Sequence, residues 1–206
     1  WWKHDQSAAG GSVIIGKGRA ADNNLEWQFR VKDTTSDKME FVMSDSGNIE
    51  TVQFELPKEV TNNSWHHWVF AFQSGTMNVY RDCIPQSGTI TSGAWPSSFY
   101  SGSADLVIGA ATAAPLNATK GSITLVTAYS GILSSGDIYN LYLGTYPGNE
   151  TFKLRRSTAA VSGLWYDESV NAFNARLGIV AGSYPALVGH YTYPPFPNET
   201  TIRQYY

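Results

Sequence analysis

The adjacent histidines His66 and His67 are the clearest candidates in this sequence for side chains that bind a metal ion. Imidazole nitrogens are common metal ligands, but a site needs several ligands that converge on one point. The surrounding residues have the pattern of a strand, in which adjacent side chains point to opposite faces. The other histidines, His4 and His190, lie far away in the sequence. We therefore expect no histidine metal site, with one imidazole at the core edge and the other on the sheet exterior.

The sequence also matches neither a phosphate-binding loop nor the paired carboxylates of a glycoside hydrolase. The run Gly11–Gly18 almost matches a phosphate-binding loop, but Gly18 stands where Ser or Thr is needed and a loop follows instead of a helix. Glycoside hydrolysis needs two carboxylates roughly 5 to 10 Å apart. Glu40 and Asp45 fall on opposite faces of a strand, and Asp167-Glu168 lies in the C-terminal part. The sequence also lacks a Gly-x-Ser-x-Gly motif, so we expect no enzyme.

Calcium is the one metal that the sequence leaves open. Asp22, Asp82 and Asp105 lie in segments with loop composition, and loop carboxylates together with backbone carbonyls suit this ion. The alternative is structural, because Asp82 can be a turn residue and Asp105 can begin a strand. No other cofactor is expected.

Four matches to the N-glycosylation motif Asn-x-Ser/Thr occur, at Asn62, Asn117, Asn149 and Asn198. None has proline at the middle position, and all four lie in expected turns or loops, where glycosylation takes place. They predict covalent N-glycans, a eukaryotic secretory route and an extracellular or cell-surface location. Mass spectrometry with and without a glycosidase tests this prediction.

Composition excludes several classes of protein. Only 15% of the 206 residues are charged and 14% are aromatic, which excludes a disordered, charge-rich chain and argues against a coiled coil. The net charge of −3 offers no basic surface for nucleic acid, and the apolar runs are too short to span a bilayer. The single cysteine, Cys83, follows Asp82 where a hairpin favours glycine. It is either a buried free thiol, which we prefer, or the partner of a cysteine in another chain.

Apolar and polar residues alternate with a period of two, which predicts strands with one buried face. Turn residues separate these runs at intervals typical of a β-sandwich or jelly roll. Ser74-Gly75 predicts a hairpin between two of the runs. The expected strands are Leu25–Val31, Met39–Met43, Val52–Leu56, Trp65–Gln73, Thr76–Arg81, Asp105–Ala110 and Ser122–Ser130.

One short helix is expected, over Ile138–Tyr142. Ser134 to Asp137 can cap its start and Gly144 can end it, so that Ile138 and Leu141 pack on the sandwich. Residues 146–206 show little alternation and many Pro and Tyr residues, with an extended run at Tyr193–Pro197. We therefore expect a sandwich over 1–145 and an extension over 146–206.

The order of several motifs resembles the laminin-G-like, concanavalin-A-like domain family. Trp65–Phe72 followed by Gly75–Asp82 is similar to that family's Trp-His-His strand, turn and Tyr-x-Asp-Gly ending, with Cys83 in place of the last glycine. Further similar segments are Ile14–Gly18, Asp105–Gly109 and Gly121–Tyr129, the last with Thr124 in place of the usual Asp. The resemblance covers residues 1 to about 143 and implies an antiparallel jelly-roll sandwich.

The resemblance also implies that a first strand precedes Trp1, so we expect that the sequence lacks its start. A second segment, Ala160–Gly189, is similar to the family's opening segment. It is either the start of a second module or a strand donated to a neighbouring subunit, because a lone opening segment cannot bury its own face. Packing of Leu164–Tyr166 on their own chain would contradict donation.

The function expected from these features is a non-enzymatic extracellular glycoprotein module. We slightly favour a structural role in assembly or adhesion, as a subunit of a cell-surface coat or filament, with protein partners or copies of itself. The alternative is a lectin that binds glycans through an aromatic platform beside polar groups. The candidates for that site are Trp95, Tyr100, Asn23 and Asn24. A glycoside hydrolase would need facing carboxylates that we do not find.

Overall fold

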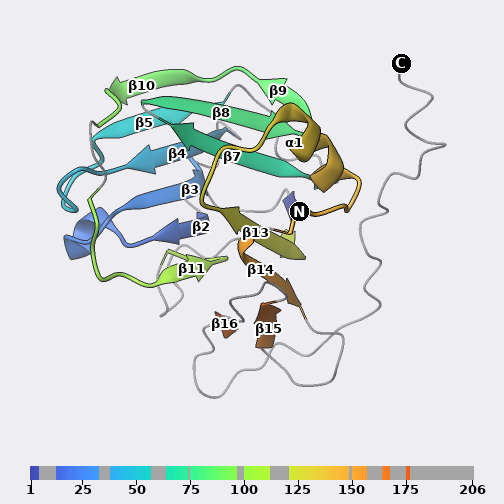
Figure 1. The fold of residues 1–206 in the computed structure, drawn as a ribbon. Helices are drawn as coiled ribbons and strands as arrows, with labels where there is room; N and C mark the ends of the chain where they lie inside the picture. The colour runs from blue at the N-terminus through green and yellow to red at the C-terminus, as the bar shows by residue number, and fades with distance from the viewer. Residues whose placement is uncertain are drawn as a thin grey trace.

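The segments with alternating apolar and polar residues form the strands of the structure, a computed structural model (Figure 1). It describes residues 1–4, 13–32, 38–56, 64–73, 75–96, 100–111, 121–148, 150–156, 164–167 and 175–176. The elements are, in order, β1 (Trp2–His4), β2 (Val13–Lys17), the 3₁₀-helix η1 (Ala20–Asp22), β3 (Trp27–Val31), β4 (Met39–Met43), β5 (Val52–Glu55), β6 (Trp65–His66), β7 (Trp68–Gln73), β8 (Thr76–Arg81), β9 (Ile84–Gln86), β10 (Thr89–Gly93), β11 (Leu106–Ile108), β12 (Gly121–Ile123), β13 (Leu125–Tyr129), α1 (Ser135–Tyr142), β14 (Glu150–Arg156), β15 (Leu164–Asp167) and β16 (Ala175–Arg176).

Six strands form one antiparallel sheet in the order β10-β5-β4-β3-β2-β11. The facing layer consists of three groups, β7-β8-β9, β12-β1-β6 and β13-β14-β15-β16. Only His67 separates β6 from β7, and only Thr124 separates β12 from β13, so these groups continue one another. The arrangement confirms the predicted all-β antiparallel sandwich of jelly-roll type.

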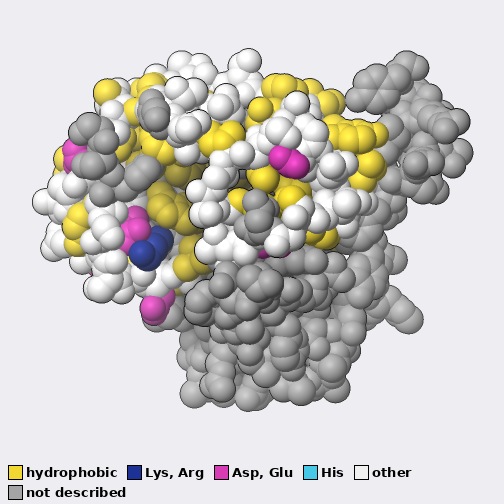
Figure 2. All heavy atoms as spheres, viewed as in Figure 1, with side chains coloured by type: hydrophobic (Ala, Val, Ile, Leu, Met, Phe, Trp, Pro, Cys, Tyr) yellow, Lys and Arg dark blue, Asp and Glu magenta, His cyan; other side chains and the backbone are white. Residues whose placement is uncertain are grey.

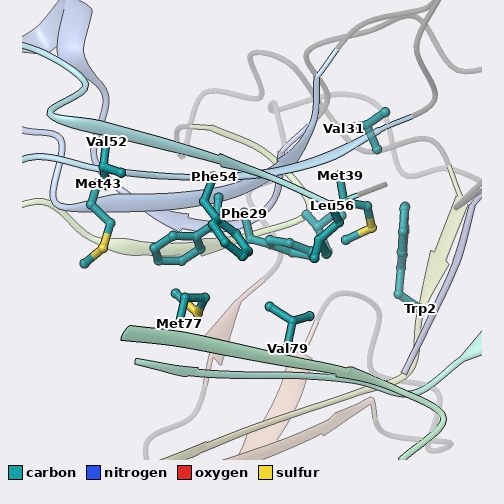
Figure 3. Packing of buried hydrophobic residues seen from close by; sticks show 12 residues of the cluster. Trp2, Phe29, Val31, Met39, Met43, Val52, Phe54, Leu56, Met77 and Val79 are labelled. Carbon is teal, nitrogen blue, oxygen red and sulfur yellow. The ribbon is translucent and has the colours of Figure 1, made fainter. Parts of the chain in front are cut away.

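The inner faces of the two layers meet in an apolar core (Figure 3). In Figure 3, Met77 and Val79 of β8 face the side chains of the six-stranded sheet. Full burial of a side chain of this size contributes roughly 1.5 to 3 kcal/mol, so the core supplies the main driving force for this packing. Its members are each at most 8% exposed. Those that the alternation predicted are Phe29, Val31, Met39, Phe41, Met43, Val52, Phe54 and Leu56, and the structure adds Trp2, Ile14, Met77 and Val79.

The strand predicted from Trp65 to Gln73 is divided at His67. The amide of His67 donates to Asp82 Oδ1 at 2.8 Å, and its carbonyl accepts from the Asp82 amide at 2.8 Å. These bonds to a turn residue interrupt the regular ladder. The predicted hairpin that follows is confirmed, because β7 pairs with β8 up to Gln73↔Thr76 and Gly75 has a φ of 76°. The predicted strand from Ser122 to Ser130 is also divided, at Thr124, whose amide donates to the Trp1 carbonyl at 3.2 Å.

The turn between β8 and β9 places Cys83 in a conformation that favours glycine. Arg81 pairs with Ile84, so Asp82 and Cys83 are the two central residues of the hairpin. Their φ values are 52° and 60°, the pattern of a type I′ turn, which prefers Asp-Gly or Asn-Gly. Cys83 is a free, half-buried thiol, and burial raises its pKa, with the charge of Asp82 as a second cause. The described residues hold no second cysteine, so an intermolecular disulfide stays untested.

Helix α1 (Ser135–Tyr142) ends and buries residues as predicted, but it begins three residues earlier than the expected Ile138. Ser134 is the N-cap, and it forms a capping box in which its Oγ accepts from the Asp137 amide at 3.1 Å while Asp137 Oδ2 accepts from the Ser134 amide at 3.0 Å. Ile138 and Leu141 are buried. Within the described part of the chain, no helix is long and apolar enough to cross a bilayer.

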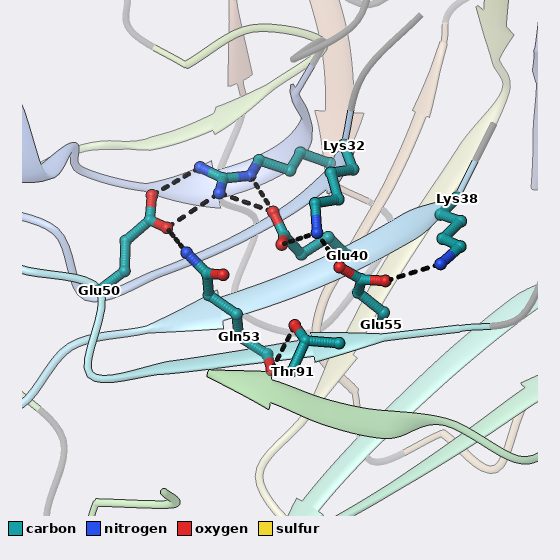
Figure 4. Close-up of polar contacts among 8 residues, drawn as sticks. Lys32, Lys38, Glu40, Glu50, Gln53, Glu55 and Thr91 are labelled. Carbon is teal, nitrogen blue, oxygen red and sulfur yellow. Dashed lines mark hydrogen bonds and ion pairs between the residues drawn. The ribbon is translucent and has the colours of Figure 1, made fainter. Parts of the chain in front are cut away.

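The outer face of the six-stranded sheet carries a network of ion pairs (Figure 4). The Arg30 guanidinium lies 2.6 Å from Glu40 and 2.7 Å from Glu50, and Glu40 is only 1% exposed. Burial alone would lower the pKa of Arg30, but the hydrogen bonds and charges of Glu50 and Glu40 raise it. Glu55 extends the network by pairing with Lys32 and, at 3.1 Å, with Lys38. Ion pairs with basic side chains of neighbouring strands thus neutralise the charges of the buried carboxylates Glu40 and Glu55.

The C-terminal part contains regular strands that the sequence did not predict. We expected an extended segment from residue 146 onward, whereas β14 pairs with β13 in antiparallel register from Leu125↔Arg155. β15 pairs with β14 of the same chain through Arg155↔Tyr166. In this structure the segment Leu164–Tyr166 thus pairs within its own chain, while its origin as the start of a second module stays a prediction. The Tyr193–Pro197 run lies outside the described residues.

Candidate functional site

A cavity of about 740 Å³, here called the inter-sheet cleft, lies between the six-stranded sheet and the strands β7 and β13. Its walls are mostly aromatic and aliphatic side chains, among them Trp27, Phe29, Trp68 and Phe70. Figure 2 shows the surface hollowed between the two halves of the sandwich, with hydrophobic side chains at the bottom of the hollow. Its size and apolar lining are those of a binding site for an organic ligand or a peptide segment.

The aromatic rings of β3 and β7 line the cleft from both layers. The ring centroids of Phe29 and Phe70 are 3.7 Å apart, and Trp68 stacks on Phe70 at 6.1 Å with an interplanar angle of 10°. Even so, no residue of β7 is fully buried, whereas all five residues of β4 are. The core is therefore closed over the six-stranded sheet but open along β7.

Glu26 is the only acidic residue among the described residues that line the cleft. Its carboxylate pairs with Lys17 Nζ at 2.7 Å, and Oε1 also accepts from the Gly102 amide at 2.8 Å. A single, ion-paired carboxylate cannot supply the acid and base of glycoside hydrolysis. The geometry of the described lining thus suits binding.

The loops at one end of the sandwich bring together three of the proposed glycan-binding residues. Gly47, which has a φ of 84°, lies close to both Tyr100 and Asn23. A Cβ atom added to Gly47 would lie 2.7 Å from the Tyr100 ring and 2.9 Å from the Asn23 carbonyl oxygen. Tyr100 therefore lies beside Asn23, whose side chain is exposed at a φ of 55°. Asn24 is already engaged, because its Oδ1 accepts from the Arg19 amide at 2.9 Å. We call Asn23, Gly47 and Tyr100 the Tyr100 loop cluster.

Trp95, the fourth proposed glycan-binding residue, lies elsewhere. Its ring centroid is 5.6 Å from Phe54 and 5.1 Å from Phe72, so it packs against the core. The sequence suggested an exposed platform because Trp95 stands in a segment rich in small and polar residues. Its apolar face is instead used for packing, which makes it a poor platform for a sugar.

The two adjacent histidines contact different groups, as their position in a strand predicted. His66 Nδ1 lies 2.5 Å from Asp82 Oδ2, whereas the His67 ring lies 5.2 Å from Trp1 and 6.1 Å from Tyr142 of α1. His67 is 7% exposed, and burial lowers its pKa to about 3. A buried imidazole held neutral between two aromatic rings serves packing.

The three proposed calcium ligands form no cluster with further acids. Asp22 pairs with Arg19 at 3.3 Å, Asp82 is bound to His66 and to the His67 amide, and Asp105 is exposed just before β11. Among the residues described, no group of three or more His, Cys, Asp or Glu side chains could hold a metal ion. All four glycosylation candidates, Asn62, Asn117, Asn149 and Asn198, lie outside the described residues.

Sequence reasoning missed both Glu26 and the cleft. Glu26 counted only as a polar position in an alternating strand, because its partner Lys17 becomes a neighbour only through the pairing of β2 with β3. The cleft gave no local signal, because its lining comes from strands that are far apart in the sequence.

Comparison with known proteins agrees with this fold. The model of the concanavalin A-like lectin/glucanases superfamily known as Laminin_G_3 matches residues 1–139. The comparison with curated proteins and the comparison with solved structures gave no match. Laminin-G-like domains are generally non-catalytic. From the match over most of its length, together with the two-layer fold, the chain belongs to the concanavalin A-like lectin/glucanase superfamily.

Proposed function

We propose that this chain is a non-enzymatic extracellular glycoprotein module with a structural role, which binds copies of itself or other proteins. The observation that carries the proposal is the inter-sheet cleft, a large apolar opening along β7 that has a single neutralised acid in its described lining. An opening of this kind exposes apolar surface to water, so covering it with another polypeptide is favourable. The four Asn-x-Ser/Thr motifs support the extracellular location.

Analytical ultracentrifugation over a range of concentrations tests the assembly role. We expect species larger than the monomer to increase with concentration, at a mass that also includes the glycans. A monomer at every concentration, with no binding to other extracellular proteins, would contradict the proposal. Mass spectrometry of the protein from a eukaryotic host, before and after glycosidase, tests Asn62, Asn117, Asn149 and Asn198 separately.

A lectin is the second candidate, favoured by the Tyr100 loop cluster. An aromatic ring beside an exposed Asn side chain is a common arrangement for binding a sugar. A glycan array on the whole chain tests this, with Tyr100→Ala as the variant that should lose binding. Asn23→Gly is a second variant, since glycine keeps the positive φ of 55° while it removes the amide. Trp95→Ala would only disturb the core and is unsuitable.

Calcium stays a separate proposal for Asp22, Asp82 and Asp105. A rise in the melting temperature at millimolar calcium would support a site, because a ligand that binds only the folded chain stabilises it. No shift would end the idea, and magnesium serves as the control ion.

A further inference from the structure

β10 (Thr89–Gly93) is an edge strand of the six-stranded sheet, and its outer side is open. It pairs with β5, and none of the other strands that the structure describes pairs with it. All five of its residues are exposed. In Figure 1, β10 runs along the top of the molecule with no labelled strand beyond it. Such an edge offers backbone donors and acceptors to which a further strand can bind.

The backbone groups that point to this open side are those of Ile90. The Leu56 amide donates to a β4 carbonyl at 2.9 Å, so Leu56 bonds toward β4. Successive strand residues bond to opposite sides, so Phe54 also bonds toward β4, whereas Glu55 bonds toward β10. In β10, Thr89 stands opposite Glu55. Thr89 therefore bonds to β5, while the amide and carbonyl of the next residue, Ile90, point to the open side.

The side chain of Ile90 is also incompletely covered. Ile90 stands opposite Phe54, so the two side chains share the face of the sheet that meets the core. Phe54 is 8% exposed, but Ile90 is 39% exposed. A further strand at this edge would place a side chain next to Ile90, and two β-branched side chains that face each other across strands stabilise a sheet.

The neighbouring edge strand β9 (Ile84–Gln86) is protected by a proline. Proline and charged side chains commonly block an open strand edge. Arg81 and Ile84 close a two-residue turn, so they bond to each other and Pro85 is the residue whose amide would face outward. Proline has no amide hydrogen, so this edge cannot donate there. The sequence thus blocks β9 at the position where a partner strand would bind.

β10 carries neither of these protections. It has no proline, and no residue from Cys83 to Ala104 is charged. In Figure 2, the upper rim of the molecule over β9 and β10 shows no acidic or basic side chain among the described residues. The register shift between Ile90 and Ser92 is a bulge, which ends the regular ladder after Ile90 but leaves the Ile90 groups open. The edge is therefore able to bind a strand around Ile90.

We propose that β10 pairs with β10 of a second copy of this chain, antiparallel and with the twofold axis at Ile90. This inference rests on the proposed role in assembly and names an interface for it. Each Ile90 amide then donates to the Ile90 carbonyl of the other copy, so the outward groups of both strands are used. The two isoleucine side chains lie opposite each other on the core side of the joined sheets.

A second copy fits this edge better than a strand with charged residues. The two edges that meet are both uncharged, so their pairing leaves no charge without a partner. In an antiparallel pair, the bulges of the two copies lie on opposite sides of the axis, so they do not collide. The contact is small, because it has few hydrogen bonds and one pair of isoleucines. We therefore expect weak association that increases with concentration.

Amide hydrogen exchange of the unmodified chain, followed by NMR, tests the proposal. It is measured at two concentrations at which ultracentrifugation shows mostly monomer and mostly dimer. We expect exchange of the Ile90 amide to slow by at least about fivefold in the dimer, because its hydrogen becomes bonded. The Thr89 amide is the internal control, since it bonds to β5 in both states and should change by less than about twofold.

Two lysine variants separate this edge from its neighbour. Ile90→Lys places two like charges opposite each other at the axis and should raise the dimer dissociation constant by at least about tenfold. Ile84→Lys is the matched control, because Ile84 is an exposed isoleucine of the protected strand β9. It should change the dissociation constant by less than about twofold. Circular dichroism and melting curves check that both variants fold.

The results that overturn this interface differ from those that overturn the assembly role. Dimers in which exchange of the Ile90 amide does not slow, or which tolerate Ile90→Lys as well as Ile84→Lys, mean that another surface holds the copies together. Slow exchange of Ile90 only in a complex with another protein assigns the edge to a foreign strand. A monomer at every concentration overturns the assembly role and this interface with it. If Ile90→Lys does not fold, the exchange experiment on the unmodified chain decides alone.

Discussion

Replacing Arg30 by methionine should destabilise the sandwich strongly, because it leaves Glu40 without its main partner. Arg30 donates through Nε to Glu40 Oε2 at 2.7 Å and through Nη1 to Glu50 Oε1 at 2.7 Å. The Glu40 side chain is 1% exposed, so water cannot replace the lost hydrogen bonds. Methionine keeps most of the apolar stem of the side chain, so the change mainly removes the guanidinium with its charge and its hydrogen bonds.

The magnitude follows from the burial of Glu40 and from what remains around it. Breaking a buried ion pair by removing one partner costs about 3 to 5 kcal/mol. Lys32 Nζ lies 3.9 Å from Glu40 Oε1 and offsets part of this loss. We therefore expect the free energy of unfolding to fall by about 3 kcal/mol at pH 7, the lower end of that range. Glu50 contributes less, because it is more exposed and keeps a hydrogen bond from Gln53 at 2.8 Å.

Urea unfolding at pH 7, followed by tryptophan fluorescence, measures this free energy. The matched control is Arg19→Met, which removes an ion pair with an exposed Asp22 and should cost at most about 1 kcal/mol. The double variant Arg30→Met/Glu40→Met removes both buried charges and should recover most of the loss. A loss below about 1 kcal/mol for Arg30→Met, or a double variant less stable than Arg30→Met, would refute the reasoning.

Three further predictions concern single side chains. Because the pKa of His67 is about 3 in the folded chain against the ordinary 6.5, the unfolded chain takes up the proton first. Stability should therefore be complete above pH 6.5 and fall by up to about 1.4 kcal/mol per pH unit toward pH 3, and His67→Phe should reduce this slope in melting curves. Cys83→Gly should stabilise by about 1 kcal/mol, since glycine adopts the φ of 60° without strain, whereas Cys83→Ala should not. Ser134→Ala should lower stability by about 1 kcal/mol through loss of the helix cap, measured by urea unfolding against Ser135→Ala as the exposed control.

Features set by neighbouring residues in the sequence were predictable. Alternation identified the inward residues of β3, β4 and β5, and the polar run from Ser134 to Asp137 indicated the capped end of α1. The glycine-like position of Cys83 was also visible, because a two-residue turn has a strict conformational requirement.

Features that depend on which strands pair were not predictable. Glu40 looked like an exposed residue of an alternating strand, yet cross-strand neighbours bury it. β14 was missed because the charged residues of Glu150–Arg156 hide its alternation, and its pairing with β13 is long-range. The place of β1 between β6 and β12 also depends on long-range pairing, which local periodicity does not encode. The candidate site is therefore mostly a property of topology, and its residues are common core types.

Asp82 links the turn between β8 and β9 to the start of β7, which gives its side chain a role beyond turn preference. An Asn at this position would also suit the turn, since both residues tolerate a positive φ. The carboxylate of Asp82 also accepts from the His67 amide through Oδ1 at 2.8 Å, and its Oδ2 lies 2.5 Å from His66 Nδ1. These contacts hold the chain at the point where β6 ends and β7 begins. A residue chosen for the conformation of one turn thereby also fixes where the neighbouring strand is divided.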